Sequence, residues 1–262
     1  MPFCQDRATK ALNAQGYSLV RYPRANIAPL DLVAGESAKL DWLGPLSDVW
    51  TARAPAPAPV EINSPNFTYQ RSGEFAGSIG VRILQGLIRN VGGNVKGNVT
   101  ISSTLSFTYE APKQYSIAPT AVGKILSSGD LDVNHPLVRR YVDEENALDS
   151  RLYVITEVLR ARKLLVRVTA ADEATAAADA QALQGLASGS ASVSSKDERH
   201  SEIAFDGSVD LTFAFRAFEL GYVNGRWDML GAAPDDRFMG GGSQSAGPAR
   251  FGDTPMVQLR GG

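Results

Sequence analysis

The chain has 262 residues, of which 44% are hydrophobic and 21% charged, with a formal net charge of −2, one cysteine and two histidines. This length and apolar content suffice for one large domain or two small ones, and the near-neutral charge gives no strong attraction to nucleic acid. The single cysteine excludes an internal disulfide framework, no apolar run reaches the roughly 18–20 residues of a transmembrane helix, and the first residues lack the apolar stretch of a secretory signal. We therefore expect a soluble cytoplasmic protein without a metal or a nucleic-acid partner.

The first sixty residues predict short elements. Residues 5–15 carry small and apolar side chains at helical spacing and end at a glycine, which predicts a helix. Residues 17–22 alternate and predict a strand. Residues 23–33 contain two prolines and predict a loop, residues 41–50 predict an irregular apolar segment docked on the core, and the Ala/Pro-rich residues 52–59 predict an extended segment.

Residues 98–109 give the clearest strand signal, because apolar and small polar residues alternate throughout. The apolar face consists of Val99, Ile101, Leu105, Phe107 and Tyr109. Upstream, residues 77–91 fit a two-residue and a helical period about equally. Each glycine in that segment would cost a helix about 1 kcal/mol relative to alanine, and the choice between strand and helix stays open.

The second half of the chain mixes helices with long strands. Residues 122–126 and 136–147 predict short helices, and residues 152–168 contain strand material. Residues 172–187 are rich in alanine with acidic residues in the first turn, which predicts a helix. The Ser/Gly-rich and charged residues 188–200 predict a loop.

Residues 203–215 alternate over their whole length and predict a second long strand. Its apolar face consists of Ile203, Phe205, Val209, Leu211, Phe213 and Phe215. Residues 234–252 are rich in Gly, Ser, Pro and Asp and predict a linker. The chain end then carries apolar residues that are unusual for a free terminus, namely Phe251, Met256, Val257 and Leu259. This end is either a disordered tail or a short peptide that docks on the body and is removable by proteolysis of the linker.

The sequence contains no catalytic signature. There is no nucleophile elbow, zinc-protease motif, phosphate-binding loop or dinucleotide fingerprint. Cys4 lies too close to the terminus to be held against a general base. His135 is interpreted as a helix-start or surface residue and His200 as part of a charged loop. We therefore do not expect an enzyme, and we expect no cofactor.

Two further patterns each allow two interpretations. Cys4, next to Phe3, is either a small buried hydrophobe, which the residues alone favour, or an S-acylation site; Pro2 excludes N-myristoylation. The strands predicted over residues 98–109 and 203–215 exceed the usual 5–6 residues and reach the roughly 9–11 that a tilted membrane-spanning strand needs. A half-buried antiparallel sheet gives the same alternation, however, and the pattern by itself favours that explanation.

Four short motifs occur in order along the first fifty residues: Phe3-Cys4, residues 16–24 (GYSLVRYPR), residues 27–30 (IAPL) and residues 43–46 (LGPL). In these motifs, in its lone cysteine, in its length and in its order of strands, helix, linker and tail, the chain resembles the bacterial gasdermins. The resemblance implies an α+β fold with a twisted, mainly antiparallel central sheet and surrounding helices. It divides the chain into a pore-forming domain, residues 1–236, and a linker with an autoinhibitory peptide, residues 237–262.

The same resemblance implies an effector of antiphage defence. A protease, often caspase-like, would remove the tail, and the released chains would oligomerise into a large β-barrel pore in the inner membrane and kill the host cell. Palmitoylation of the family's N-terminal cysteine carries over to Cys4. We expect the cut near Arg237, Phe238, Met239 and Gly240, and tail contacts through Phe251, Met256, Val257 and Leu259.

The pore strands would come from residues 72–109 and 163–215, each forming one hairpin. The membrane-facing residues would then be Val99, Ile101, Leu105, Phe107, Ile203, Phe205, Val209, Leu211 and Phe213. The intact chain would be a cytoplasmic monomer, and the cut chain a membrane-bound oligomer. The alternative is a soluble α+β module whose sheet curls around a lipid or another apolar ligand.

Overall fold

The computed structural model describes residues 12–36, 39–51, 57–71, 103–128, 130–132, 134–139, 151–186, 191–197, 200–223, 226–230, 248–249, 251 and 256–260. The predictions for Cys4, for residues 77–91 and for most of the linker lie outside these residues.

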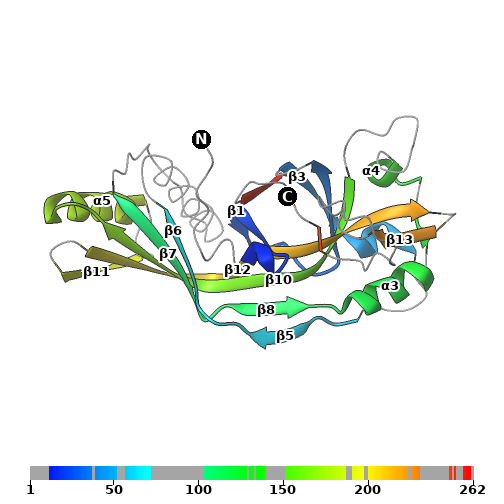
Figure 1. Ribbon diagram of the computed structural model, residues 1–262, viewed down its shortest axis with the longest axis horizontal. Helices are drawn as coiled ribbons and strands as arrows, with labels where there is room; N and C mark the ends of the chain where they lie inside the picture. Colours follow the sequence, from blue (N-terminus) through cyan, green and yellow to red (C-terminus); the bar gives the residue numbers. More distant parts are fainter. Residues whose placement is uncertain are drawn as a thin grey trace, which may run out of the picture.

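The described part of the chain consists mainly of strands (Figure 1). They are β1 (Ser18–Arg24), β2 (Asp31–Glu36), β3 (Lys39–Pro45), β4 (Trp50–Thr51), β5 (Val60–Asn63), β6 (Phe67–Arg71), β7 (Thr104–Glu110), β8 (Lys113–Ser116), β9 (Asp130–Leu131), β10 (Arg151–Thr169), β11 (Ala191–Asp197), β12 (His200–Val223), β13 (Arg226–Leu230) and β14 (Met256–Arg260). The helices are the 3₁₀ turn η1 (Leu46–Asp48), α3 (Pro119–Ser128), α4 (Pro136–Arg139) and α5 (Glu173–Leu186).

Two long strands, β10 and β12, form the axis of the molecule and run along its longest dimension in Figure 1. They pair antiparallel from Leu152 opposite Leu220 to Thr169 opposite His200. The ladder is interrupted three times, and at the largest interruption residues 207–210 of β12 lie opposite a single residue of β10. Bulges of this kind bend a strand and change which face its side chains occupy.

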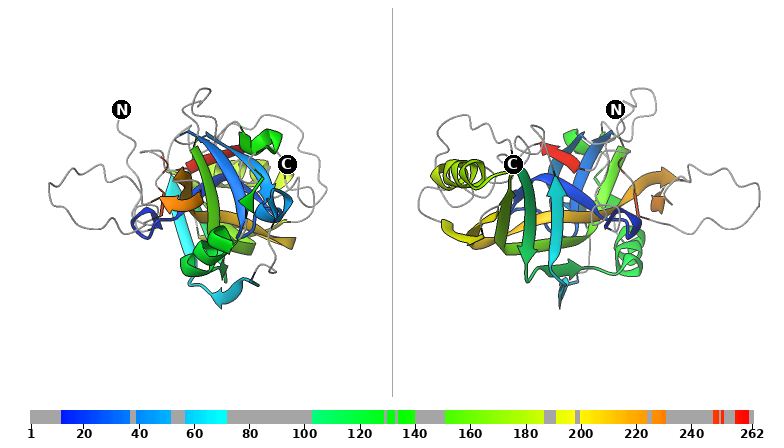
Figure 2. Two further views of the ribbon diagram at one scale, coloured as in Figure 1. Left: turned by 90° about the vertical axis from the view of Figure 1, so that its right-hand side faces the viewer. Right: turned by 60° about the vertical axis from the view of Figure 1, so that its left-hand side comes forward.

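At one end of this axis six strands close into a ring. The order is β12, β1, β14, β3, β2 and β10, and β10 pairs again with β12. All of these pairs are antiparallel except those of β14, which is parallel to both of its neighbours. Every strand of the ring contributes to one buried cluster, so that this part of the core lies inside the ring. The two views in Figure 2 show β14, in red, beside the blue β1 and β3.

At the other end, the sheet continues as β11, β12, β10, β7 and β6. Helix α5 packs against β10, β11 and β12. Its N-terminus is capped by Asp172, whose Oδ1 accepts the Thr175 amide at 2.8 Å. The side chains between the helix and the sheet belong to a second cluster that includes Phe107, Phe213 and Ala180.

Several predicted elements are confirmed. The strand over residues 17–22 is β1, the described part of residues 98–109 contains β7, and residues 152–168 form the single strand β10. The helix expected at residues 172–187 is α5. The mainly antiparallel sheet is also confirmed, although the parallel strand β14 makes it mixed.

Three local predictions are wrong. Residues 39–45 form the regular strand β3 rather than an irregular segment, residues 191–197 form β11 rather than a loop, and β2 begins at Asp31, inside the predicted loop. Strands β2 and β3 are held by backbone pairing to the distant strands β10 and β14, and β11 by pairing with the following strand β12, which local periodicity does not report. The expected surrounding helices are not confirmed, because the described helices lie toward the two ends of the molecule (Figure 1).

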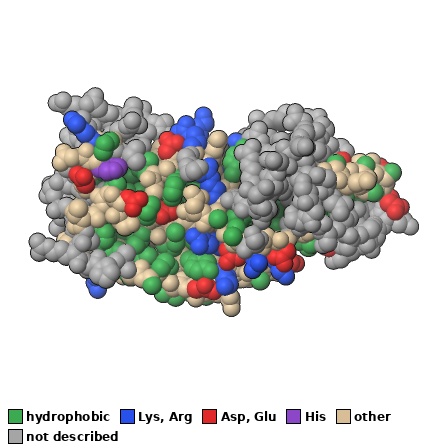
Figure 3. All heavy atoms as spheres, turned by 180° about the vertical axis from the view of Figure 1, so that it is seen from behind, with side chains coloured by type: hydrophobic (Ala, Val, Ile, Leu, Met, Phe, Trp, Pro, Cys, Tyr) green, Lys and Arg blue, Asp and Glu red, His purple; other side chains and the backbone are tan. Residues whose placement is uncertain are grey.

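The surface carries charges of both signs. On the described part of the face in Figure 3, Lys and Arg side chains are interspersed with Asp and Glu and with apolar residues. Several of these charges form exposed pairs, such as Arg260 with Asp41 and Lys113 with Glu61. Exposed pairs of this kind add little to stability, because water and salt screen them.

Candidate functional site: the C-terminal strand and the residues that hold it

Strand β14 fills the gap between β1 and β3. Residues 256–257 lie in register with residues 19–20 of β1, and residues 258–260 lie in register with residues 39–41 of β3. No other described strand joins β1 to β3. The last strand of the chain therefore closes the ring of the fold.

The alternation within β14 directs its apolar residues inward. The exposed fractions of Val257 and Leu259 are 1% and 2%, and Met256 is half-buried. Both buried side chains belong to the cluster inside the ring. Burying a side chain of this size stabilises a fold by about 1.5–3 kcal/mol relative to leaving it in water.

Phe251 adds an aromatic anchor ahead of β14. Its exposed fraction is 4%. Its ring packs edge-on against Tyr153 with centroids 4.8 Å apart, and at 5.8 Å from the ring of Phe215. The tail thus contacts both axial strands, because Tyr153 lies on β10 and Phe215 on β12.

Polar contacts fix the path of the tail. The guanidinium of Arg24 donates through Nη2 to the carbonyl oxygen of Leu259 at 2.7 Å, and the Ala249 amide donates to the Ala217 carbonyl at 2.7 Å. These hydrogen bonds use backbone groups of the tail and hold its position whatever its side chains are.

The start of the tail also covers the N-terminal turn. Gly16 has φ of +82°, and a Cβ atom at this position would lie 2.3 Å from Cγ of Pro248 and 3.4 Å from Nε of Arg216. Only glycine combines this backbone conformation with so close an approach. The N-terminal turn and the tail are therefore packed against each other directly.

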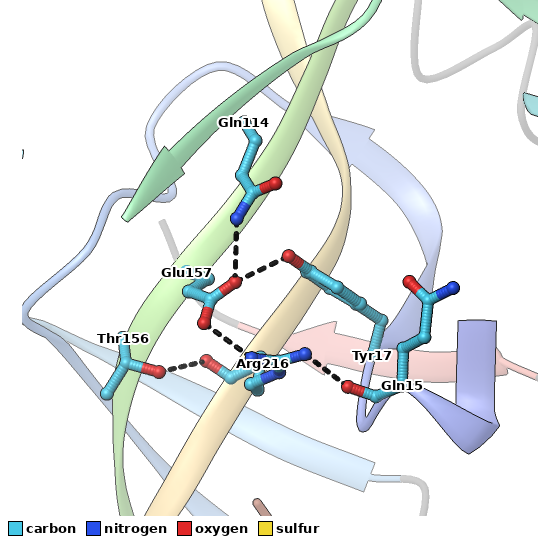
Figure 4. A network of polar contacts seen from close by, with 6 residues as sticks. All are labelled: Gln15, Tyr17, Gln114, Thr156, Glu157 and Arg216. Atoms are coloured by element: carbon cyan, nitrogen blue, oxygen red, sulfur yellow. Dashed lines mark hydrogen bonds and ion pairs between the residues drawn. The ribbon is translucent and has the colours of Figure 1, made fainter. Parts of the chain in front are cut away.

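Beside this turn lies a partly buried polar network of Glu157, Arg216, Tyr17, Gln114 and Gln15 (Figure 4). Glu157 accepts hydrogen bonds from the Tyr17 hydroxyl at 2.5 Å and Gln114 Nε2 at 3.0 Å, and its Oε1 lies 2.5 Å from Arg216 Nη1. Arg216 also donates through Nη2 to the carbonyl oxygen of Gln15. The network joins β8, β10, β12 and the turn before β1.

Within the network the Glu157 carboxylate is shielded from water, whereas the Arg216 side chain is 25% exposed. The exposed fraction of Glu157 is 8%, and the guanidinium of Arg216 lies 4.7 Å above the ring of Tyr17. Burial, followed by the hydrogen bond to Glu157, raises the pKa of Tyr17 well above its usual range, so the hydroxyl stays a donor. No group of the described residues accepts a hydrogen bond from the buried Nε atom of Arg216.

A second buried carboxylate docks helix α5. Asp179, with an exposed fraction of 8%, accepts the Ser103 amide at 2.9 Å and the Ser103 hydroxyl at 2.6 Å. Ala176 and Ala180 lie on the same buried face of the helix. The helix is therefore attached to the segment that leads into β7 by a polar contact beside small side chains.

Of the nine residues predicted to face a membrane, the structure describes the side chains of six, and five of these are buried. The buried ones are Leu105, Phe107, Ile203, Leu211 and Phe213, each at most 3% exposed. Phe213 stacks on Tyr109 with ring centroids 4.0 Å apart. Val209 differs from them, because it is 40% exposed within the bulge at residues 207–210. The apolar face expected over residues 203–215 is therefore interrupted there.

The remaining predicted site residues cannot be placed. Cys4, Val99, Ile101 and the expected cleavage region, Arg237, Phe238, Met239 and Gly240, lie outside the described part of the chain, as does the side chain of Phe205.

Sequence reasoning missed the polar network. Glu157 is the one charged residue in the apolar run of residues 152–159, and Arg216 stands alone between residues 211 and 218 in the same way. A lone charge at such a position is rarely buried without a partner. The sequence could therefore have indicated that Glu157 and Arg216 pair with each other. Nothing in the sequence pointed to their further partners Tyr17 and Gln114.

The described residues contain no cluster of His, Cys, Asp and Glu side chains that could hold a metal ion. Among the helices that the structure describes, none is both long enough and apolar enough to cross a membrane.

A solved structure shares the fold of this chain. The chain is similar to the structure of a bacterial gasdermin from Bradyrhizobium tropiciagri, with a TM-score of 0.59 and 18% identity over 96% of this chain and 95% of that one. The model of the Bacterial Gasdermin Family matches residues 20–232. The chain belongs to this family of pore-forming proteins, and it is not an enzyme.

Curated relatives agree with this assignment. The chain is 26% identical over 238 residues to a gasdermin of Vitiosangium sp., with 89% of this chain and 88% of that protein covered. It is also 26% identical over 259 residues to a gasdermin of a Desulfuromonadales bacterium, with 97% and 92% covered. The family as a whole oligomerises and inserts into membranes after activation.

Proposed function

We propose that this chain is an autoinhibited pore-forming effector of bacterial antiphage defence. A single observation carries the proposal: the last strand, β14, closes the ring by pairing with both β1 and β3 and buries Val257 and Leu259. Removing that strand would leave two unpaired edges and an opened core, which are the conditions under which sheets rearrange or associate.

The proposed trigger is proteolysis of the linker. An associated protease of the caspase-like class would cut in the region of Arg237, Phe238, Met239 and Gly240. Before the cut, the linker keeps β14 at a high local concentration beside its partners. After the cut the tail is a separate peptide and dissociates by mass action.

The released body would then convert into membrane strands. Residues 72–109 and 163–215 are proposed to form two hairpins that assemble with those of other copies into an inner-membrane β-barrel pore. Buried side chains such as Leu105 and Phe213 would then face lipid, and the closure of the barrel would satisfy the backbone groups that lipid cannot.

A palmitoyl group on Cys4 is proposed to assist this step. A single acyl chain gives only marginal and reversible membrane binding. Lipidation would therefore help insertion and assembly rather than hold the intact chain at the membrane. The cell would keep the uncut protein in the cytoplasm and lose its membrane barrier after the cut.

Dye release from liposomes tests the proposal. A specific protease sequence in place of residues 241–246 allows the tail to be cut after the intact chain has folded. We expect no release from the uncut chain, and release together with ring-shaped oligomers after the cut. The unmodified chain treated with the same protease is the control. A cut chain that stays monomeric and leaves vesicles intact would overturn the proposal.

A further inference from the structure

The contacts that hold β14 are ones that a separate peptide can also make. Its backbone pairs with residues 19–20 of β1 and residues 39–41 of β3, and the side chain of Arg24 donates to its Leu259 carbonyl. None of these contacts depends on a covalent link between β14 and the body. We call the space between β1 and β3, with its lining, the β14 slot.

We propose that the β14 slot is a peptide-binding site that takes up a released tail in trans. This inference rests on the proposed function, since the slot opens only when the chain's own tail leaves it. Its ligand class is an extended peptide, running parallel to β1 and β3, with apolar side chains at alternate positions. The occupant we assign is the tail of a second, cut copy of this chain.

The slot selects its ligand by pattern and direction. The two inward positions of the strand, those of Val257 and Leu259, enter the cluster inside the ring and require apolar side chains. The positions between and after them are less buried, and Arg260 lies 2.9 Å from Asp41. Because strand addition reads hydrogen bonds along both edges, a peptide in the reverse direction would lose the register of these contacts.

A further anchor lies ahead of the strand. Phe251 sits between Tyr153 and Phe215, and the Ala249 amide pairs with the Ala217 carbonyl. A peptide covering residues 248–262 contains all of these groups, whereas one covering residues 256–262 contains only the strand. The longer peptide should therefore bind more tightly.

Rebinding makes the release of the tail reversible until the cut chains assemble, although the linker itself stays cut. In the uncut chain a flexible linker supplies an effective concentration on the order of millimolar. After the cut, the fraction of open slots depends on the free tail concentration instead. A cut chain would therefore be closed again by the free tail of a second copy, and membrane assembly would have to compete with this rebinding.

The test uses the cleavable full chain described above, cut in solution. A fluorescently labelled peptide of residues 248–262 is titrated by anisotropy, and the unlabelled peptide is added to the liposome assay. At about ten times its Kd the peptide leaves about one slot in eleven open, so the leakage rate should fall at least tenfold. A peptide carrying Val257→Asp and Leu259→Asp is the matched control and should neither bind nor slow leakage.

A second variant removes the need for cutting. The uncut chain with Val257→Asp and Leu259→Asp in its own tail keeps every residue of the body, and the wild-type peptide should bind to it while leaving the unaltered intact chain unlabelled. If neither the cut chain nor this variant binds the peptide at about 1 mM, within the effective concentration that the linker supplies, the inference is overturned.

The two proposals fail in different ways. Leakage after the cut without any peptide binding would contradict the proposed peptide-binding site and support the proposed pore. Peptide binding by a cut chain that never permeabilises vesicles would support the peptide-binding site and contradict the proposed pore.

Discussion

Pro248 of the tail lies against Gly16 of the N-terminal turn so closely that no side chain fits between them. The same glycine lies beside the Arg216–Glu157 pair, since a Cβ atom on residue 16 would also lie 3.4 Å from Arg216 Nε. The N-terminal turn thus contacts both the tail and this charge pair.

Gly16→Ala should weaken the binding of the tail to the body without altering the sequence of the tail. Alanine at a positive φ costs about 1–2 kcal/mol, and overpacking against Pro248 adds about 1–3 kcal/mol. We expect lower stability in urea and faster hydrogen exchange in residues 256–260. Gly123→Ala is the control, because the nearest atom to its added Cβ is Met229 Cε at 4.0 Å. Unchanged exchange in β14 would show that the contact does not couple the two segments.

Val257→Asp should activate the intact chain. The substitution buries an unpaired carboxylate inside the ring, which costs at least about 3 kcal/mol unless the strand leaves. Liposome leakage without proteolysis is the expected result. Gln258→Asp, at the next and less buried position of the same strand, should cause no leakage without proteolysis. Equal leakage from both variants would mean that charge on the tail, rather than its burial, controls release.

Glu157→Gln should destabilise the body of the protein. It leaves the partly buried Arg216 guanidinium without its anion. Breaking a fully buried pair costs about 3–5 kcal/mol, and we expect the lower end of this range because Arg216 is 25% exposed. Urea denaturation measures the loss. Asp206→Asn removes a carboxylate that is 61% exposed and pairs with Arg162 and Lys163, so its cost should stay within about 1 kcal/mol. Similar losses for the two variants would contradict a buried network.

Asp31 gives a prediction for pH dependence. Burial raises the pKa of this carboxyl above 3.8, against the lowering effect of its hydrogen bonds from Trp42 and Ala28. The folded state therefore holds the proton more tightly than the unfolded state. Its contribution to stability is complete below pH 3.8 and is lost as the pH rises through the folded pKa. The stability of the wild type relative to Asp31→Asn should fall over that interval, as urea titrations at several pH values would show. If the stability of the wild type relative to Asp31→Asn rose over that interval, the pKa of Asp31 would be lowered in the folded state rather than raised.

Asp179→Ala should free helix α5. The Ser103 amide and hydroxyl would lose a buried acceptor, at a cost of about 1–3 kcal/mol. We expect faster hydrogen exchange in residues 173–186 and, after cleavage of the tail, faster leakage, because in the proposed pore α5 would have to detach before its segment forms a membrane hairpin. Gln181→Ala, on the exposed face of the same helix, is the matched control. Slower leakage from Asp179→Ala would contradict this order of events.

The strands and helix with strong periodicity were predictable from the sequence. The alternation of residues 98–109 and 203–215 and the capped, alanine-rich segment at residues 172–187 led to the described part of β7, to β12 and to α5. These elements are determined by which side chains fall on one face, a local property that a single sequence displays. The apolar residues at the end of the chain were also recognisable from the sequence, because such residues are unusual at a free terminus. The resemblance to the bacterial gasdermins was recognisable as well.

The partners of these elements were decided only by the tertiary structure. Residues 39–45 and 191–197 have no clear alternation, yet they form β3 and β11 because other strands offer them backbone partners, the distant β14 for β3 and the following β12 for β11. The contact of Arg24 with Leu259 spans 235 positions, and that of Tyr17 with Glu157 spans 140. The sequence by itself therefore determined the apolar faces and the family of this protein. Which edges the last strand joins, and which charge neutralises which, depend on the closed sheet, because backbone hydrogen bonds and buried ion pairs exist only once both partners are in place.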